Sequence, residues 1–306
     1  MNYRLALVLL TLVLVIGTLA VVLAITTAPL PEQTLDGATL RAEPARGNYA
    51  FVTFVCSGDA YIPGAIMVAY GLKHLQQVRQ RVIVLVTPDV SAQGQKTLRK
   101  WFDEVREVPY IEMPLKTTES RFQKIYTKLN ILRLTEYDKI VYIDADLFPI
   151  RNFTHLLTLP APAANNDIMP PANLLTPPAR HGERLSERET SCNLPRFAGI
   201  NAGLMVLEPS EKAFQDMMRD LPNTPYHCWP EQRWITKYYS GKWTHIHPRF
   251  NYQTTAHESM GSPACVKNVF GLHFTGAGKP WQDEIKKPSK ATRFWQAHYR
   301  LARQMR

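Results

Sequence analysis

The 306-residue chain has few cysteines and no internal repeat. Four cysteines are too few for a disulfide scaffold in a chain of this length. Hydrophobic residues make up 45% and charged residues 20%, which excludes a wholly disordered or collagen-like chain. A chain this long forms one large domain or two small ones, and it buries a core without disulfides or metals.

Charge is missing altogether from Leu5 to Ile25. A helix of that length spans roughly 30 Å, the thickness of the bilayer core. Arg4 precedes the run and Arg41 is the next basic residue, so the positive-inside rule predicts that residues 1–4 are cytosolic. We expect a signal-anchor helix at 5–25, a proline-containing stem at 26–46, and a type II protein whose catalytic domain lies in the lumen of the Golgi or ER. The alternative is a cleaved signal peptide, whose apolar region usually has about 7–15 residues.

A lumenal location would place the four cysteines in an oxidising compartment, where their pairing stays open. They are Cys56, Cys192, Cys228 and Cys265. Cys56 lies in an apolar run and fits a buried free thiol equally well. Asn152-Phe153-Thr154 matches the glycosylation sequon, although short sequons also arise by chance.

The body at 47–283 alternates strand and helix patterns. Apolar runs predict strands at 49–55, 81–86, 139–143, 200–207 and 269–273. Helices are expected from Pro63 to Leu75, after a Ser91 cap, and at 121–134. This order is typical of an α/β fold with a mainly parallel sheet flanked by helices. Residues 158–195 break the pattern, which indicates either a functional lid or a surface loop without a role.

Two aspartates follow the strand at 139–143 directly. Residues two apart on an extended chain point the same way, so Asp144 and Asp146 are expected to share one side of the sheet edge. Ligands of open α/β sheets bind beyond the carboxyl ends of strands. Two adjacent carboxylates repel each other unless a cation or a proton lies between them. The pair therefore predicts a divalent metal site, although an isolated Asp-x-Asp is more often a turn.

A second group of residues follows the strand at 269–273. His273 can offer an imidazole nitrogen to the same metal, and two carboxylates with one imidazole suit Mn²⁺ better than Mg²⁺. Gly276 and Gly278 allow backbone N–H groups to approach an anion, and Lys279 adds a charge suited to phosphate. Alone, His273 would be read as a core histidine and the glycines as a turn. Together with the aspartates they predict a site for a metal and a diphosphate.

At this point the sequence resembles glycosyltransferase family 8, the glycogenin-like enzymes with a GT-A fold. The resemblance runs from about Tyr49 to Trp281. It is carried by FVTFVCSGDAYIPGA at 51–65, YTKL and LTEYDKIVYIDAD within 126–146, INAGLMVLEPS at 200–210, PEQRWIT at 230–236 and LHFTGAGKPW at 272–281. It implies a GT-A, Rossmann-like domain that transfers a hexosyl group from a UDP-sugar to a glycan or protein acceptor, with retained configuration and Mn²⁺ on the diphosphate.

The resemblance also implies roles for individual residues. The implied metal ligands are Asp144, Asp146 and His273. Donor contacts are implied for Phe54, Cys56, Tyr61, Arg121, Asp144, Ala145, Ala202, Gly276 and Lys279. Catalytic roles are implied for Lys128, Asn201, Glu231 and Gln232. One extra residue before Tyr61, and Glu231 where the family usually has aspartate, depart from the family pattern.

Residues 284–306 hold seven basic residues and one glutamate, out of a net charge of +10. Interleaved aromatic residues indicate a helix near anionic lipid or an acidic acceptor, and a solvated basic tail is the plainer reading. No nucleic-acid-reading motif is present, so we expect no nucleic-acid partner. Two other function classes stay open: a metal-dependent nucleotide-sugar hydrolase, and a non-catalytic sugar-nucleotide-binding protein.

Overall fold

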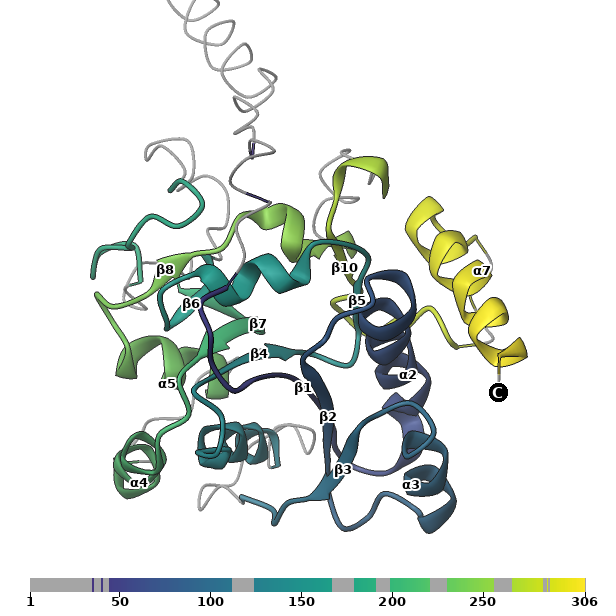
Figure 1. Ribbon diagram of the computed structural model, residues 1–306, viewed down its shortest axis with the longest axis horizontal. Coiled ribbons are helices and arrows are strands. Elements are labelled where there is room, and N and C mark those ends of the chain that lie inside the picture. The colour runs from purple at the N-terminus through teal and green to yellow at the C-terminus, as the bar shows by residue number, and fades with distance from the viewer. Residues whose placement is uncertain are drawn as a thin grey trace, which may run out of the picture.

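A seven-stranded sheet forms the centre of the molecule, in the order β3-β2-β1-β4-β7-β6-β8 (Figure 1). Its strands are β1 (Tyr49–Val55), β2 (Arg81–Val86), β3 (Glu104–Glu107), β4 (Lys139–Ile143), β6 (Ala163–Asn166), β7 (Ile200–Leu207) and β8 (Thr244–His245). The computed structural model describes residues 44–111, 124–166, 179–190, 199–220, 230–255, 266–282 and 287–305, together with Leu35, Leu40 and Ile285.

The sheet is mainly parallel, as the sequence predicts. β1 pairs in parallel with β2 and β4, and β2 pairs in parallel with β3. β7 runs antiparallel to both β4 and β6, while β8 is again parallel to β6. The predicted strands at 49–55, 81–86, 139–143 and 200–207 are confirmed as β1, β2, β4 and β7.

Alternate residues of the strands face two separate hydrophobic cores. Phe51 and Val141 face the core that includes α2, while Val52 and Tyr142 face the core that includes the chain around Tyr126. Successive side chains of a strand point to opposite faces, so a sheet covered on both sides has nearly continuous apolar strands. This explains why β1, β2 and β4 show no polar alternation.

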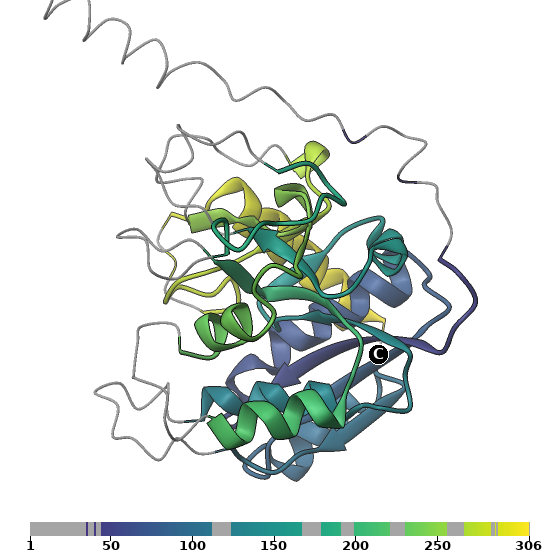
Figure 2. The ribbon, with the colours of Figure 1, turned by 90° about the vertical axis from the view of Figure 1, so that its left-hand side faces the viewer.

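Helices cover both faces of the sheet. The helices are α2 (Ile62–Tyr70), α3 (Ala92–Leu98), α4 (Glu211–Asp220), α5 (Pro230–Tyr238) and α7 (Lys290–Gln304). In Figure 1, α2 and α3 lie on one side with α7 outside α2, and α4 and α5 lie on the other. Figure 2 shows α4 running beside the short helix η5 (Ile125–Arg133), which it contacts.

A smaller sheet adjoins the first, in the order β5-β10-β9. It consists of β5 (Leu147–Pro149), β9 (Tyr252–Gln253) and β10 (Gly271–His273). Three residues, 144–146, connect β4 of the large sheet to β5 of the small one. The strand predicted at 269–273 is shorter than expected, because the Phe270 N–H donates to the carbonyl of Arg249 instead of a strand neighbour.

The helix expected at 121–134 is a 3-10 helix over its described part, Ile125–Arg133. One side-chain hydrogen bond competes here for a carbonyl of the helix itself, and two others tie the helix to residues 109–111. The Asn130 amide donates to the carbonyls of Thr127 and Pro109, and the Thr127 hydroxyl accepts from the Ile111 N–H. The apolar pattern predicts a helix here correctly, but it does not predict the 3-10 form.

The segment at 158–195, expected to be irregular, contains a strand. Ala163–Asn166 forms β6 in the interior of the large sheet, between β7 and β8. Alanine and asparagine have low strand propensity, so the sequence gives no signal for it. Residues 167–178 and 191–195 of this segment lie outside the described residues.

Helix α7 begins at a Ser289 cap, where the hydroxyl accepts from the Thr292 N–H, and it packs on α2. Trp295, Ala291 and Ala302 are buried, whereas Lys290, Arg293, Arg300 and Arg303 are exposed on the other side.

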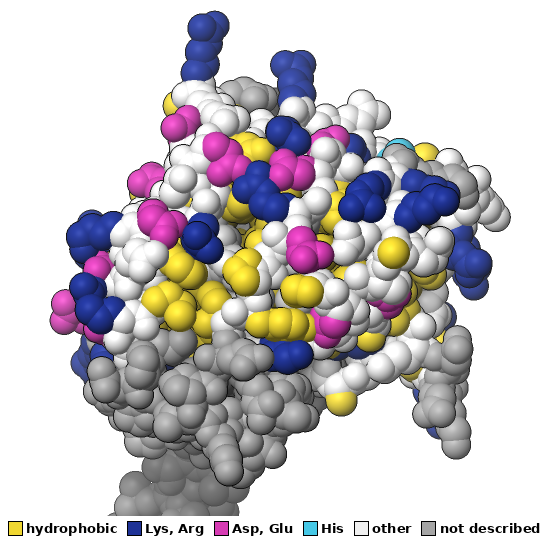
Figure 3. Space-filling model, turned by 90° about the horizontal axis from the view of Figure 1, so that it is seen from below, with side chains coloured by type: hydrophobic (Ala, Val, Ile, Leu, Met, Phe, Trp, Pro, Cys, Tyr) yellow, Lys and Arg dark blue, Asp and Glu magenta, His cyan; other side chains and the backbone are white. Residues whose placement is uncertain are grey.

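Figure 3 shows the molecule from below the view of Figure 1, where basic and acidic side chains are interspersed among hydrophobic ones. The charge of that face is therefore mixed.

Among the described residues, no helix is long and apolar enough to cross a bilayer. The anchor predicted at Leu5–Ile25 lies outside those residues. Cys56 is a free, half-buried thiol, and burial raises its pKa. Cys192, Cys228 and Cys265 are also outside the described residues, so their pairing stays open.

Candidate active site

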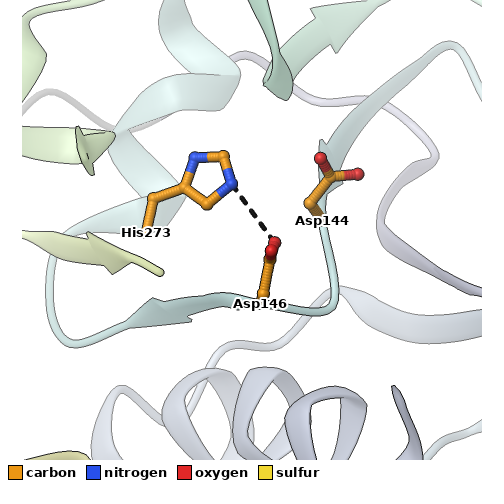
Figure 4. Close-up of side chains that lie close together, drawn as sticks. All are labelled: Asp144, Asp146 and His273. Atoms are coloured by element: carbon orange, nitrogen blue, oxygen red, sulfur yellow. Dashed lines mark ion pairs between the residues drawn. The ribbon is translucent and has the colours of Figure 1, made fainter. Parts of the chain in front are cut away.

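Two aspartates and a histidine meet where the two sheets join. The ligand atoms of Asp144, Asp146 and His273 all lie within 4.8 Å of one another, and His273 Nε2 is 3.2 Å from Asp146 Oδ1 (Figure 4). The sequence predicts that the two aspartates lie on an extended chain, but they do not. The Leu147 N–H donates to the Asp144 carbonyl at 2.9 Å, so Asp144–Leu147 is a turn. This turn still brings both carboxylates to the same place.

Backbone hydrogen bonds hold this turn between the sheets. The Asp144 N–H donates to the Gly203 carbonyl on β7 at 2.8 Å. The Phe274 N–H donates to the Asp146 carbonyl at 2.9 Å, next to the His273–Leu147 pair of β10 and β5. Main-chain hydrogen bonds therefore place the backbone of all three residues at the junction of the two sheets.

Each aspartate has a lysine partner. Lys279 Nζ forms an ion pair with Asp146 and also donates to the Phe274 carbonyl at 2.8 Å. Lys128 Nζ lies 3.0 Å from an oxygen of Asp144. Burial alone would raise the pKa of Asp146, but His273 and Lys279 outweigh burial and hold that pKa below its ordinary value. Asp146 is therefore ionised in the folded chain at neutral pH.

Glu231 is buried beside Lys128, with its Oε1 3.4 Å from Lys128 Nζ. Its Oε2 atom is buried and has no hydrogen-bond partner within the described part of the chain. Burial raises the pKa of Glu231. Burial would lower the pKa of Lys128, but the carboxylates of Asp144 and Glu231 outweigh burial and raise that pKa. Glu231 thus carries an acceptor atom that nothing described in this chain satisfies.

Gln232 and Asn201 connect the start of α5, β7 and the histidine. Gln232 Oε1 accepts from the Ala202 N–H at 3.0 Å. Asn201 Oδ1 accepts from the side chain of Asn251 at 2.9 Å, and Asn251 Oδ1 lies 2.7 Å from His273 Nδ1. Asn201 is therefore linked through Asn251 to His273, while Gln232 is bonded to the backbone of Ala202, the next residue of β7.

Of the residues expected to contact a nucleotide, Tyr61 is the one that lies beside Lys279. The Tyr61 ring is 37% exposed, edge-on to Trp281 at 5.6 Å, and 5.7 Å from Lys279 Nζ. Cys56 follows β1, with Phe54 buried on that strand. Ala145 is buried, and Gly276 has a positive φ of 88°, which favours glycine. Arg121 lies outside the described residues.

Two residues of the site were missed from the sequence. Tyr142 donates its hydroxyl to Asp144 Oδ1, and Asn251 contacts His273. Tyr142 had a usable signal, because it precedes Asp144 by two residues at the end of a strand. Asn251 had none, since an isolated asparagine in an irregular stretch matches no motif.

The donor set fits a divalent cation. His273 Nδ1 is hydrogen-bonded to Asn251, and Nε2 is the nitrogen that faces Asp146 (Figure 4). Two carboxylates and one imidazole nitrogen within 4.8 Å are of the kind and spacing that transition metals use. Asp144, Asp146 and His273 could hold such an ion.

Several known proteins are similar to this chain. Protein R707 of Acanthamoeba polyphaga mimivirus is 30% identical over 241 residues, which are 76% of this chain and 83% of that protein. Galactinol synthase 3 of Arabidopsis thaliana is 24% identical over 76% of this chain and 73% of the synthase. Inositol phosphorylceramide glucuronosyltransferase 1 of the same plant is 28% identical, over 62% of this chain but only 30% of that protein.

Solved structures share the fold at low identity. The galactosyltransferase LgtC, in complex with donor and acceptor sugar analogs, has a TM-score of 0.52 and 16% identity, covering 82% of this chain and 95% of its own. The glycosyltransferase GlyE of Streptococcus pneumoniae TIGR4 also has a TM-score of 0.52, covering 81% of this chain and 59% of its own. These structures support the GT-A-like α/β fold.

The sequence model of glycosyl transferase family 8 matches residues 52–285, a region that includes Asp144, Asp146 and His273. This match covers most of the chain, and it agrees with the cluster at the junction of the two sheets. The chain therefore belongs to glycosyl transferase family 8 and is a glycosyltransferase.

Proposed function

We propose that this glycosyltransferase moves a hexosyl group from a UDP-sugar to a glycan or protein acceptor, with retained configuration and with Mn²⁺ as its cofactor. The observation that carries the proposal is the meeting of Asp144, Asp146 and His273 beside Lys279. Retention, UDP and the acceptor class are supported by family membership.

The donor set favours Mn²⁺, because an imidazole ligand is less suited to Mg²⁺. Asp146 supplies a carboxylate that is already ionised, since His273 and Lys279 lower its pKa. A bound ion would supply positive charge to the diphosphate of the leaving UDP. The chain's own contribution is to hold three ligand atoms together in a buried place.

Lys279 is suited to the negative charge that UDP carries as it leaves. Its ammonium group is buried and paired with Asp146, and it lies near the Tyr61 ring. A ring for the base and a cation for the phosphates thus occupy the same side of the cluster. Preorganised positive charge at a leaving group stabilises the transition state.

Glu231 is suited to the donor sugar. Its buried Oε2 lacks a partner in the described chain, and a sugar hydroxyl could donate to it. Lys128 joins Glu231 to Asp144, which keeps this acceptor close to the cation ligands. The names of the relatives point to different sugars, so the donor needs a direct screen.

The screen measures thermal stabilisation of the full chain by UDP-glucose, UDP-galactose and UDP-glucuronate, each with Mn²⁺ or with EDTA. Only a bound ligand raises the melting temperature by mass action. We expect Mn²⁺-dependent stabilisation by one donor, followed by transfer to an added acceptor. Donor-dependent sugar release at the same rate without acceptor would instead favour the hydrolase, and failure of every nucleotide to bind would favour the non-catalytic protein.

Asp146→Asn removes the ligand charge while keeping the shape of the side chain. We expect transfer to fall by at least about 100-fold, or about 2.7 kcal/mol. Asp220→Asn is the matched control, because Asp220 is an exposed aspartate on α4. Equal activity of the two variants would contradict the proposed cation site.

For the location, we propose a type II membrane protein with a lumenal body, supported by the uncharged run at 5–25 after Arg4. Asn152 offers a reporter, because it is exposed and begins the sequon. In eukaryotic cells, we expect a glycosidase-sensitive mobility shift that Asn152→Gln removes, and carbonate-resistant membrane association. Extraction of the chain by carbonate would contradict the anchor.

A further inference from the structure

A chain of buried polar groups stands behind His273. It runs from the Gly203 backbone on β7 through Asn201 and Asn251 to the imidazole. Asn201 is 7%, Asn251 1% and His273 4% exposed. Water has little access to these groups, so each must be satisfied by its neighbour.

The direction of each hydrogen bond follows from the first donor. A backbone N–H can only donate, so the Gly203 N–H at 3.0 Å identifies the Asn201 atom it faces as the carbonyl oxygen. That oxygen is also 2.9 Å from the Asn251 side chain, which must present its NH₂ group there. The carboxamide oxygen of Asn251 then faces His273 Nδ1 at 2.7 Å, and this nitrogen must carry the proton.

We propose that Asn251 is a positioning residue: anchored by Asn201, it keeps a proton on His273 Nδ1, so that Nε2 is the ring nitrogen that faces the aspartates and that a divalent cation would take. The proposal rests on the cation site proposed above. It assigns Asn201 a role through Asn251 and His273, in addition to its implied place beside the donor sugar.

A competing tautomer explains why such a device is needed. His273 Nε2 is 3.2 Å from Asp146 Oδ1, so a proton on Nε2 could donate to that carboxylate. The Nε2–H form would gain this bond and lose the ability to bind a cation. Acceptance by Asn251 at Nδ1 opposes it, because a partner on one ring nitrogen decides which nitrogen carries the proton.

The backbone leaves the ring little room to turn away. A Cβ atom at Gly203 would overlap the His273 ring and the Asn201 carboxamide oxygen, so both side chains lie directly over this glycine. The Thr254 hydroxyl donates to the His273 carbonyl at 3.2 Å. Ring position and tautomer are thus determined by different contacts.

The first measurement needs no metal. Nitrogen-15 chemical shifts of the histidine rings in the full chain distinguish the two tautomers, and His273→Gln identifies the resonance of His273. In the wild type we expect a proton on Nδ1, either in the Nδ1–H tautomer or in the imidazolium whose Nε2–H also faces Asp146. In Asn251→Leu we expect a shift toward the Nε2–H form, because leucine offers no acceptor to Nδ1 while Asp146 still faces Nε2. A wild type in the Nε2–H form overturns the proposal.

The second measurement is Mn²⁺ affinity, followed by the electron paramagnetic resonance of free Mn²⁺. Loss of a partner that orients a metal ligand typically weakens binding by about 10- to 100-fold, and we expect this for Asn251→Leu. Asn251→Asp keeps an acceptor at Nδ1 and should retain both the tautomer and more of the affinity. Asn201→Leu is a second variant that tests the same relay if Asn251→Leu does not fold.

Thr190→Val is the control for loss of a buried polar group, because Thr190 is 1% exposed and bonds to the 186–190 turn instead. It should lower stability without changing tautomer or affinity. Unchanged tautomer and Mn²⁺ affinity in Asn251→Leu would overturn the positioning role. A wild type that is Nδ1–H but binds no Mn²⁺ would overturn the cation site, and with it the functional half of this proposal.

Discussion

At the scale of single residues, the two aspartates are charge-balanced by lysines of the same chain. Lys279 pairs with Asp146, and Lys128 pairs with Asp144 and Glu231. Lys279 was expected to contact the donor and Lys128 to have a catalytic role, and the structure adds that both also neutralise the aspartates. Because Lys279 is 6% exposed, its ammonium group depends on this partner.

This pairing predicts that Asp146→Ala lowers stability as well as activity. Removing one partner of a buried ion pair typically costs about 3–5 kcal/mol, because the other charge is left uncompensated. Urea unfolding would measure the loss. The double variant Asp146→Ala/Lys279→Met removes both charges and should be more stable than Asp146→Ala alone; a double variant that is less stable would contradict the explanation.

The site was predictable from the sequence where a motif or a strand end marked it. Asp144, Asp146 and His273 follow strands, so their meeting could be inferred from the α/β pattern. Asn251 was not predictable, because its role depends on a contact with His273 that only the folded chain creates. Tyr142 was overlooked, although its place on β4 sets its hydroxyl against Asp144.

At the scale of elements, a helix cap joins α3 to the loop that carries Tyr61. The Ser91 hydroxyl accepts from the Gly94 N–H at 2.9 Å and donates to Asp59, and the Ser91 N–H also donates to Asp59. The cap predicted from the sequence is confirmed. Its link to Asp59 was not foreseen, because it joins residues 32 positions apart.

We expect Ser91→Ala to cost about 1 kcal/mol, the usual effect of losing an N-cap. Ser210→Ala is a matched control, because the Ser210 hydroxyl accepts from the Ala213 N–H at the start of α4. Both variants should melt earlier, but only Ser91→Ala should weaken UDP binding, since it releases Asp59 beside Tyr61. Equal UDP affinity in the two variants would contradict the link between the Ser91 cap and the loop that carries Tyr61.

The strands of the large sheet were the most predictable elements. β1, β2, β4 and β7 are buried on both faces, so each is a nearly continuous apolar run in the sequence, interrupted by Thr53 in β1 and Asn201 in β7. β6 was missed because its four residues are alanine and asparagine, and its strand conformation is imposed by β7 and β8. Tertiary pairing outweighed local propensity there.

At the scale of the whole molecule, four histidines gather beside the described part of the 158–195 segment. His155 and His181 are in contact at 2.9 Å, and the His247 N–H donates to His181. Burial lowers the pKa of His181 to about 4 and that of His245 to about 3. The rings of His181 and His245 are therefore neutral in the folded chain at pH 5, whereas unfolded histidines take up protons below about pH 6.5.

This difference predicts that stability falls as pH falls from about 6.5 toward 4. The unfolded chain binds more protons in that window, so lower pH favours it. At pH 5, His245 alone accounts for a loss of about 2 kcal/mol relative to neutral pH. Urea unfolding at pH 7 and pH 5 measures the change, which His245→Asn should reduce. A wild type that is equally stable at both values would contradict the prediction.

The connection between the two sheets has a consequence for how this protein tolerates changes in length. Residues 144–146 join β4, which is fastened by β1 and β7, to β5, which is fastened by β10. Neither end can slide to absorb an added residue. A single alanine inserted after Ala145 should therefore separate the carboxylates far more than any substitution would, whereas loops that join elements at the surface accept insertions readily.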